Sequence, residues 1–254
     1  MADGLFLVGT ARGVGKTLIG VGIVALLREM GVDATMMTPI LTGGSVESAT
    51  ALLRQIGVRE PRRLLMPVTY ETPAAPYVAS QVEGRPVNLR LVLDAYHALR
   101  AQGKFVVVEG GGVLVPIARR YDMIDLLKDF ELPSIIIGRS GRGTLNHCML
   151  THRMMLVMGV QPLGFVLNGY GQYGDGFAES LNPEALRELA APTPVLATLE
   201  WRPEYQTDVH AFVDALRQQN GLVALLERLA TTAGMTDAPS PTGTPIVPGP
   251  PLPS

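Results

Sequence analysis

The residues best suited to chemistry lie near the N-terminus, in the segment Gly9-Thr10-Ala11-Arg12-Gly13-Val14-Gly15-Lys16-Thr17. The segment follows a short apolar run at residues 5–8, which is typical of a strand covered on both faces. Glycines let backbone amides turn inward around phosphate oxygens, and the helix that follows adds the positive end of its dipole. Lys16 would reach the β and γ phosphates, and Thr17 would bind Mg²⁺. The predicted nucleotide contacts are Gly13, Val14, Gly15, Lys16, Thr17 and Leu18.

The spacing of this loop departs slightly from the usual form, because five residues separate Gly9 from Gly15 where the common pattern has four. A glycine-rich turn with a chance Gly-Lys-Thr is the alternative. The order of strand, loop and helix favours a phosphate-binding loop, although that loop serves many unrelated reactions.

A second chemically suited residue is Glu109, at the end of the apolar run 105–108 and just before Gly110-Gly111-Gly112. An acid at the carboxyl end of a strand beside the phosphate loop would face the nucleotide and hold Mg²⁺, directly or through water. The alternative is a solvated carboxylate at a strand end. The sequence thus predicts a magnesium site made by Thr17 and Glu109.

The elements that must position these residues follow from the alternation of short apolar runs with helical patterns. The expected strands are 5–8, 34–40, 105–108, 134–137, 164–167 and 195–198, and the expected helices are 16–30, 45–55, 87–101 and 145–158. Ser45 has the character of an N-cap. This pattern predicts an α/β, P-loop NTPase-type three-layer fold with a mostly parallel central sheet and helices on both faces. We expect one domain over residues 1–233 and a Pro-rich disordered tail over 234–254.

Composition narrows the classes of function. The 254 residues carry 21 basic and 23 acidic side chains, so no basic surplus indicates a nucleic-acid partner. One cysteine and four histidines make a disulfide framework or a structural zinc site improbable. The apolar stretch 18–27 is too short to span a bilayer, which needs about 20 residues. We expect a cytoplasmic protein with no membrane partner, since the N-terminus also lacks a secretory signal pattern.

Several stretches resemble the dethiobiotin synthase family. The loop 9–17 is similar to its Gly-Thr-Asp-Thr-x-Val-Gly-Lys-Thr, residues 107–113 to its Val-Glu-Gly-Ala-Gly-Gly strand end, and Leu145-Asn146-His147-Cys148-Met149-Leu150-Thr151 to its Ile-Asn-His-x-Leu-Leu-Thr helix start. Residues 73–79 and 83–86 resemble its segment after the second helix. Asn168 falls at the family's adenine-contacting asparagine, and Glu204 lies in a region like its adenine-side loop. The resemblance covers roughly residues 4–230.

The resemblance implies an ATP- and Mg²⁺-dependent ligase that joins CO₂ to 7,8-diaminononanoate. A carbamate forms on one amine, takes the γ-phosphoryl group, and is closed to a cyclic urea by the second amine. It also implies a homodimer with the active site at the interface. The substrate contacts carried over are Thr42, Gly111, Gly143, Thr144, Leu145 and Asn146, the last four as backbone amides at a helix N-terminus. From the residues alone, Thr144 and Asn146 also suit plain helix capping.

Three positions depart from the family pattern. Thr38 stands where the family has a lysine that contacts phosphate and carbamate, and loss of such a charged donor typically costs about 10²–10³ in rate. Ser48 replaces a Mg²⁺-binding aspartate, with Glu47 next to it. Ala11-Arg12 replaces Asp-Thr, and Arg12 either restores the missing charge near the γ-phosphate or faces solvent. We take Lys16, Arg12 and Thr42 as the catalytic candidates.

Two other classes of function stay open. The altered positions suit a divergent nucleotide-binding paralogue that has weak or changed catalysis and serves a regulatory role. A switch ATPase like the Min and Par partitioning proteins is a third class. Those proteins place a lysine five residues before the Gly-Lys-Thr lysine, where this chain has Ala11.

Overall fold

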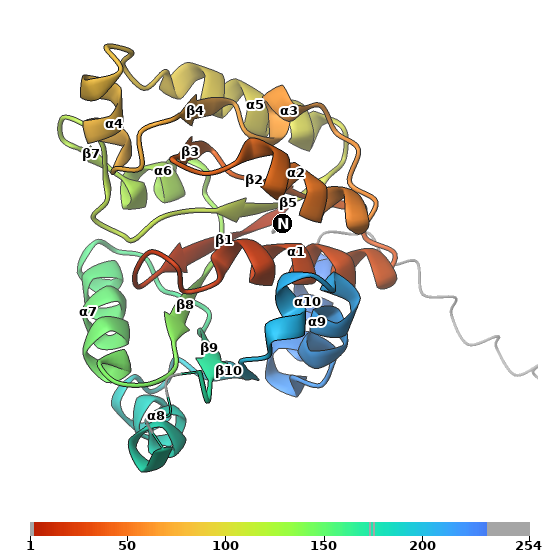
Figure 1. Ribbon diagram of the computed structural model, residues 1–254, viewed down its shortest axis with the longest axis vertical. Coiled ribbons are helices and arrows are strands. Elements are labelled where there is room, and N and C mark those ends of the chain that lie inside the picture. The colour runs from red at the N-terminus through yellow and green to blue at the C-terminus, as the bar shows by residue number, and fades with distance from the viewer. Residues whose placement is uncertain (1–2, 173, 175, 233–254) are drawn as a thin grey trace, which may run out of the picture.

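Six parallel strands form the central sheet of the computed structural model, which describes residues 3–172, 174 and 176–232 (Figure 1). Their order across the sheet is β10 (Val195–Glu200), β9 (Phe165–Tyr170), β8 (Ser134–Arg139), β1 (Gly4–Gly9), β5 (Phe105–Glu109) and β2 (Ala34–Met37). The apolar runs are buried because helices cover both faces of the sheet. The predicted three-layer α/β fold with a parallel sheet is therefore confirmed.

The two helical layers receive alternate side chains of each strand. Leu5 and Leu7 of β1 belong to one buried cluster, whereas Phe6 and Val8 belong to the other. The first cluster includes residues of α1 (Lys16–Glu29), α9 (Val209–Arg217) and α10 (Asn220–Thr232). The second includes residues of α5 (Leu89–Ala101), α6 (Met123–Asp129), α7 (Thr144–Val157) and α8 (Gly176–Leu189). A strand that faces two apolar layers explains why its sequence is continuously hydrophobic.

Strand β1 lies at the centre of this arrangement, between β8 and β5. Leu7 is in register with Glu109 of β5, and Gly9 with Ile137 of β8. The carboxyl ends of the three strands therefore meet at one edge of the sheet, where the phosphate loop begins. Such an edge is where ligands bind in open α/β sheets.

The predicted strand 34–40 is wrong in its second half. The sheet strand β2 ends at Met37, and the Thr38 amide donates to the Leu65 carbonyl at 2.8 Å. Pro39 follows and has no amide hydrogen to continue a ladder. The chain then forms β3 (Ile40–Thr42), which pairs in parallel with β4 (Val68–Tyr70) in a separate small sheet.

Shorter elements complete the described chain. Ser45 caps α2 (Val46–Gln55), since its hydroxyl accepts from the Ser48 amide at 3.1 Å as expected for an N-cap. The others are α3 (Arg62–Leu65), α4 (Pro76–Val82), the antiparallel pair β6 (Pro116–Ala118) and β7 (Tyr121–Asp122), and the 3₁₀ helix η1 (Pro203–Gln206).

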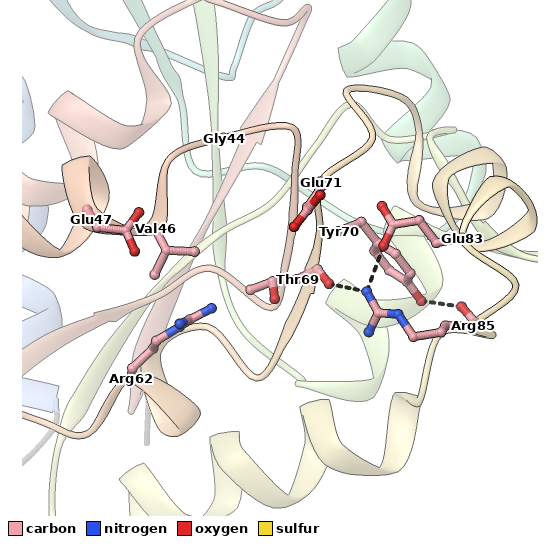
Figure 2. A pocket seen from close by; sticks show the side chains of 9 residues that line it. All are labelled: Gly44, Val46, Glu47, Arg62, Thr69, Tyr70, Glu71, Glu83 and Arg85. Carbon is pink, nitrogen blue, oxygen red and sulfur yellow. Dashed lines mark hydrogen bonds and ion pairs between the residues drawn. The ribbon is translucent and has the colours of Figure 1, made fainter.

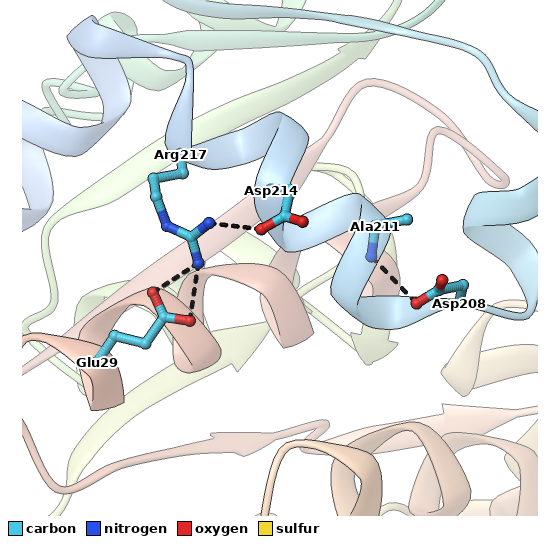
Figure 3. A network of polar contacts seen from close by, with 5 residues as sticks. All are labelled: Glu29, Asp208, Ala211, Asp214 and Arg217. Carbon is cyan, nitrogen blue, oxygen red and sulfur yellow. Dashed lines mark hydrogen bonds and ion pairs between the residues drawn. The ribbon is translucent and has the colours of Figure 1, made fainter.

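An exposed ion pair joins residues of α9 and α1 that are distant in sequence (Figure 3). The Arg217 guanidinium donates to both carboxylate oxygens of Glu29 at 3.0 Å and also contacts Asp214. Asp208 caps α9 by accepting from the Ala211 amide at 3.1 Å. The exposed ion pairs add little stability, so the apolar contacts between α1 and α9 hold these helices together.

Among the described helices, none has the length and hydrophobicity to cross a bilayer. The Pro-rich segment 234–254, and with it the predicted domain boundary at residue 233, lies outside the described residues.

Candidate active site

The loop between β1 and α1 has the backbone shape of a phosphate cradle. Gly15 adopts a φ of 91°, in the left-handed region, and a Cβ there would lie 2.1 Å from the Asn168 amide nitrogen. At Gly9 a Cβ would lie 2.7 Å from the Lys16 ammonium nitrogen. The left-handed backbone at Gly15 favours glycine, whereas a side chain at Gly9 would displace the end of the Lys16 side chain. The loop thus brings its backbone and the Lys16 side chain together without room for other side chains, which suits the triphosphate of a nucleotide.

Lys16 folds back over the loop, where its Nζ donates to the Ala11 carbonyl at 3.4 Å. Burial lowers the pKa of the Lys16 ammonium, and the Glu109 carboxylate partly offsets that shift. A partly buried ammonium whose one hydrogen bond within the chain is long suits a phosphate anion as its partner.

Glu109 joins two segments that are distant in sequence. The Thr17 hydroxyl donates to Glu109 Oε1 at 2.7 Å, and the Thr38 hydroxyl donates to Oε2 at 3.1 Å. Burial raises the pKa of the Glu109 carboxyl, against the hydrogen bonds of both threonines and the charge of Lys16. A hydroxyl and a carboxylate in contact supply the oxygen ligands that Mg²⁺ prefers, so Thr17 and Glu109 fit the metal.

A cavity of about 470 Å³ opens beside the phosphate loop. Its lining includes all three catalytic candidates, Lys16, Arg12 and Thr42. The metal candidate Glu109, the substrate candidate Gly111, and Thr10 and Thr38 line it as well. Arg12 reaches across to donate to the Pro73 carbonyl at 3.4 Å. The structure therefore brings Lys16, Arg12 and Thr42 together around one space.

The apolar wall of this cavity was missed as a site by sequence reasoning. It is formed by Pro39, Ile40, Leu41, Pro73, Ala74, Ala75, Pro76, Val115 and Met123. The segment 73–76 resembles a segment of the family, and that resemblance could have indicated that it lies at the site. Val115 and Met123 come from the segment after β5 and carry no pattern that marks them.

Glu47 does not reach this cavity. Its carboxylate accepts from the Ser45 hydroxyl at 3.2 Å and lines a second cavity of about 480 Å³ (Figure 2). That cavity also contains Arg85, which donates to Glu83 at 2.7 Å and to the Thr69 carbonyl at 2.9 Å. Ser48 is exposed on the first turn of α2. Within the described residues, neither position lines the space beside the phosphate loop.

The remaining predicted contacts lie elsewhere along the same sheet edge. Asn168 of β9 donates to the Val14 carbonyl at 3.0 Å, so it touches the phosphate loop. Glu204 is exposed in η1 after β10. The segment 143–146 opens α7, whose N-cap is Gly143 without a side-chain capping bond, so the capping expected of Thr144 and Asn146 is wrong. The Thr144 hydroxyl instead donates to the Ser140 carbonyl at 3.0 Å. Of the residues described, none of 143–146 lines the 470 Å³ cavity of its own chain.

Comparison with known proteins agrees with this geometry. A family profile described as an AAA domain matches residues 3–208. An ATP-dependent dethiobiotin synthetase of Bacillus licheniformis is 33% identical over 83% of this chain and 91% of its own length. The synthetase of Anaeromyxobacter dehalogenans is 38% identical over 79% of this chain and 91% of its own.

Solved structures support the fold. The septum site-determining protein MinD of Pyrococcus horikoshii, complexed with Mg-ADP, superposes with a TM-score of 0.55 at 16% identity, over 92% of this chain and 98% of that one. MinD from the MinC:MinD complex of Aquifex aeolicus gives 0.58 at 12% identity, over 91% and 96%. Identities this low show the shared P-loop NTPase fold and nothing about activity. The family follows instead from the curated relatives, and this chain belongs to the ATP-dependent dethiobiotin synthetase family.

Proposed function

We propose that this protein is an ATP- and Mg²⁺-dependent ligase that closes a cyclic urea from CO₂ and 7,8-diaminononanoate. The observation that carries the proposal is the single cavity in which Lys16, Arg12 and Glu109 face an apolar wall. The charged end suits the reacting phosphoryl and carbamate groups, and the wall suits an aliphatic chain. The family membership of the chain supports the same reaction.

Each side chain has a defined task in this proposal. Thr17 and Glu109 would hold Mg²⁺, which offsets the charge of the triphosphate when bound. Lys16 places its ammonium against the terminal phosphates, and the loop amides orient them. Asn168 and Glu204 serve the adenine side, while Thr42 and Gly111 contact the diamine end of the substrate.

Arg12 takes over the charge that is missing at Thr38. The Thr38 hydroxyl is engaged with Glu109 at 3.1 Å and has no positive charge to offer an anion. The Arg12 guanidinium lines the same cavity, and its contact with Pro73 is long, at 3.4 Å. Several of its five donors are free for a carbamate or phosphoryl oxygen.

Phosphate release tests this proposal. Purified protein is given ATP, Mg²⁺ and bicarbonate, with and without 7,8-diaminononanoate. We expect release that depends on the diamine, and a loss of about 10²–10³ in Arg12→Ala because a charged donor to the transition state is removed. The matched control is Arg90→Ala, since Arg90 is exposed on α5 and lies away from the cavity.

Two other outcomes would contradict the proposal in different ways. ATP binding without diamine-dependent release, restored by Thr38→Lys, would identify a decayed site in a divergent paralogue. Hydrolysis stimulated by a protein or a membrane, and indifferent to the diamine, would identify a switch ATPase.

A further inference from the structure

Helix α8 presents two buried polar side chains on one face. Glu179 is 2% exposed and Asn182 is 9% exposed, three residues apart, so both lie on the same side of the helix. The helix packs against α7 and β10 (Figure 1). Buried carboxylates and amides require partners, and the partners here belong to two loops at the nucleotide edge of the sheet.

Glu179 holds Gly171, the first residue after β9. Its Oε1 accepts from the Gly171 amide at 3.0 Å. Gly171 follows Tyr170, whose carbonyl accepts from the Trp201 amide at 2.8 Å. The strand that leads into this loop carries Asn168, which donates to Val14 of the phosphate loop. Glu179 therefore fixes the segment that continues from the adenine side of the site.

Asn182 holds the loop before α7. Its Nδ2 donates to the Gly141 carbonyl at 3.0 Å, and the same carbonyl accepts from the Thr144 amide at 3.3 Å. The adjacent Ser140 amide donates to the Asn168 carbonyl at 2.7 Å. These hydrogen bonds, together with the backbone that connects them, join α8 and both loops to the phosphate loop.

We propose that Glu179 and Asn182 are positioning residues, which clamp the two loops and keep the base side of the nucleotide site in register with the phosphate loop. The proposal rests on the nucleotide site described above. Neither side chain lines the reaction cavity, so each acts through the loop it holds. The clamp matters for a ligand that spans both sides, and it is irrelevant to one that occupies the phosphate loop alone.

Comparing two ligands tests the clamp. Mg-ATP uses both the phosphate loop and the base side, whereas Mg-tripolyphosphate uses only the phosphate loop. In Glu179→Leu we expect ATP to bind about tenfold more weakly, in line with losing a hydrogen bond to a charged group, and tripolyphosphate affinity to be unchanged. Titration calorimetry measures both. Glu179→Gln keeps an acceptor oxygen and should restore ATP binding.

The single tryptophan gives an independent signal, because Trp201 is bonded to the residue before Gly171. ATP should alter its fluorescence in the wild type, and tripolyphosphate should not. The ATP response should shrink in Glu179→Leu and in Asn182→Leu. Glu188→Leu is the matched control, because Glu188 is exposed on the same helix.

Three results would overturn the inference. The first is equal weakening of both ligands in Glu179→Leu, with no rescue by glutamine, which would show a general structural role. The second is wild-type ATP affinity in both leucine variants. The third is a wild type that binds neither ligand, which would also remove the proposed nucleotide site. If ATP binding is intact but turnover does not depend on the diamine, the proposed ligase reaction is contradicted and the inference about Glu179 and Asn182 is unaffected.

Discussion

Glu109 is a partly buried carboxylate that links two separate segments of the site. Its two oxygens accept from Thr17 and Thr38, which come from the phosphate loop and from the end of β2. The sequence indicated Glu109 as a metal ligand and Thr38 as a lost charge. It could not indicate that Thr38 bonds to Glu109, since that contact depends on where the chain turns between the two sheets.

The raised pKa of Glu109 has a consequence for stability. Below its ordinary pKa of 4.5 both the folded and unfolded states carry the proton, and the free energy of unfolding is unaffected. Between pH 4.5 and the raised pKa the unfolded state loses its proton before the folded state does, so the free energy of unfolding falls across this window and the loss is complete above the raised pKa. We therefore expect Glu109→Gln to melt at a higher temperature than wild type at about pH 8, with no difference near pH 4.

Calorimetric melting in the absence of nucleotide measures this difference. A gain of 1 kcal/mol would raise Tm by about 2–4 °C in a domain of this size. Glu188→Gln, on the surface of α8, should show no such pH-dependent gap. The same Glu109 variant should lose the Mg²⁺-dependent part of its ATP affinity. A Glu109→Gln protein that is less stable than wild type at pH 8 would contradict the burial argument.

At the scale of elements, substitutions at two glycines with similar backbone angles distinguish backbone strain from steric crowding. Gly15 has a φ of 91° and Gly31 a φ of 84°, but a Cβ at Gly31 would meet nothing within 4 Å. We expect Gly31→Ala to cost about 1 kcal/mol in unfolding free energy and to leave ATP affinity unchanged. Gly15→Ala should lose ATP binding as well, because its methyl group would strike Asn168.

Urea unfolding and ATP titration, carried out on both variants, check this pair. Asn168→Ala added to Gly15→Ala removes the struck side chain, so the double variant should recover part of the stability lost by the single one. If Gly15→Ala bound ATP as well as Gly31→Ala does, the tight approach of Asn168 to the loop would have no role in binding.

The sequence predicted the elements well where one kind of residue dominates a segment. Phe105–Val108 and Ile135–Ile137 are buried apolar runs, and both became sheet strands. The prediction for 34–40 failed because apolar residues continue past Met37 while Pro39 prevents further pairing. Helix α8 was not anticipated either, since Pro183 lies inside it and glycines precede it. Pro183 lies in the middle of α8, a position that a sequence pattern ordinarily assigns to a helix end.

At the scale of the whole molecule, the substrate contacts predicted at residues 143–146 lie outside the 470 Å³ cavity of their own chain. The amides at the start of α7 suit a carboxylate, yet no described residue of 143–146 lines the cavity. The proposed homodimer resolves this if each α7 serves the cavity of its partner. Mixing two inactive variants, Lys16→Ala and Asn146→Asp, should then restore activity in the mixed dimer.

Statistical exchange puts one intact site in each mixed dimer, so a one-to-one mixture should reach about a quarter of the wild-type rate of phosphate release. Each variant alone should stay inactive, as should a mixture of Lys16→Ala with itself after the same treatment. No recovery in a mixture shown to exchange subunits would place the carboxylate contact within a single chain.

The central place of β1 in the sheet bears on how such a protein can diverge. Thr38 and the cavity wall lie on the flank of β5 and β2, whereas Asn168 and the loops held by α8 lie on the flank of β8, β9 and β10. Under the proposed function, mutations on the first flank can change the acceptor molecule without altering the residues proposed to bind the purine. Mutation can thus change the specificity for the acid substrate while the binding of ATP stays the same, and a relative could diverge in this way.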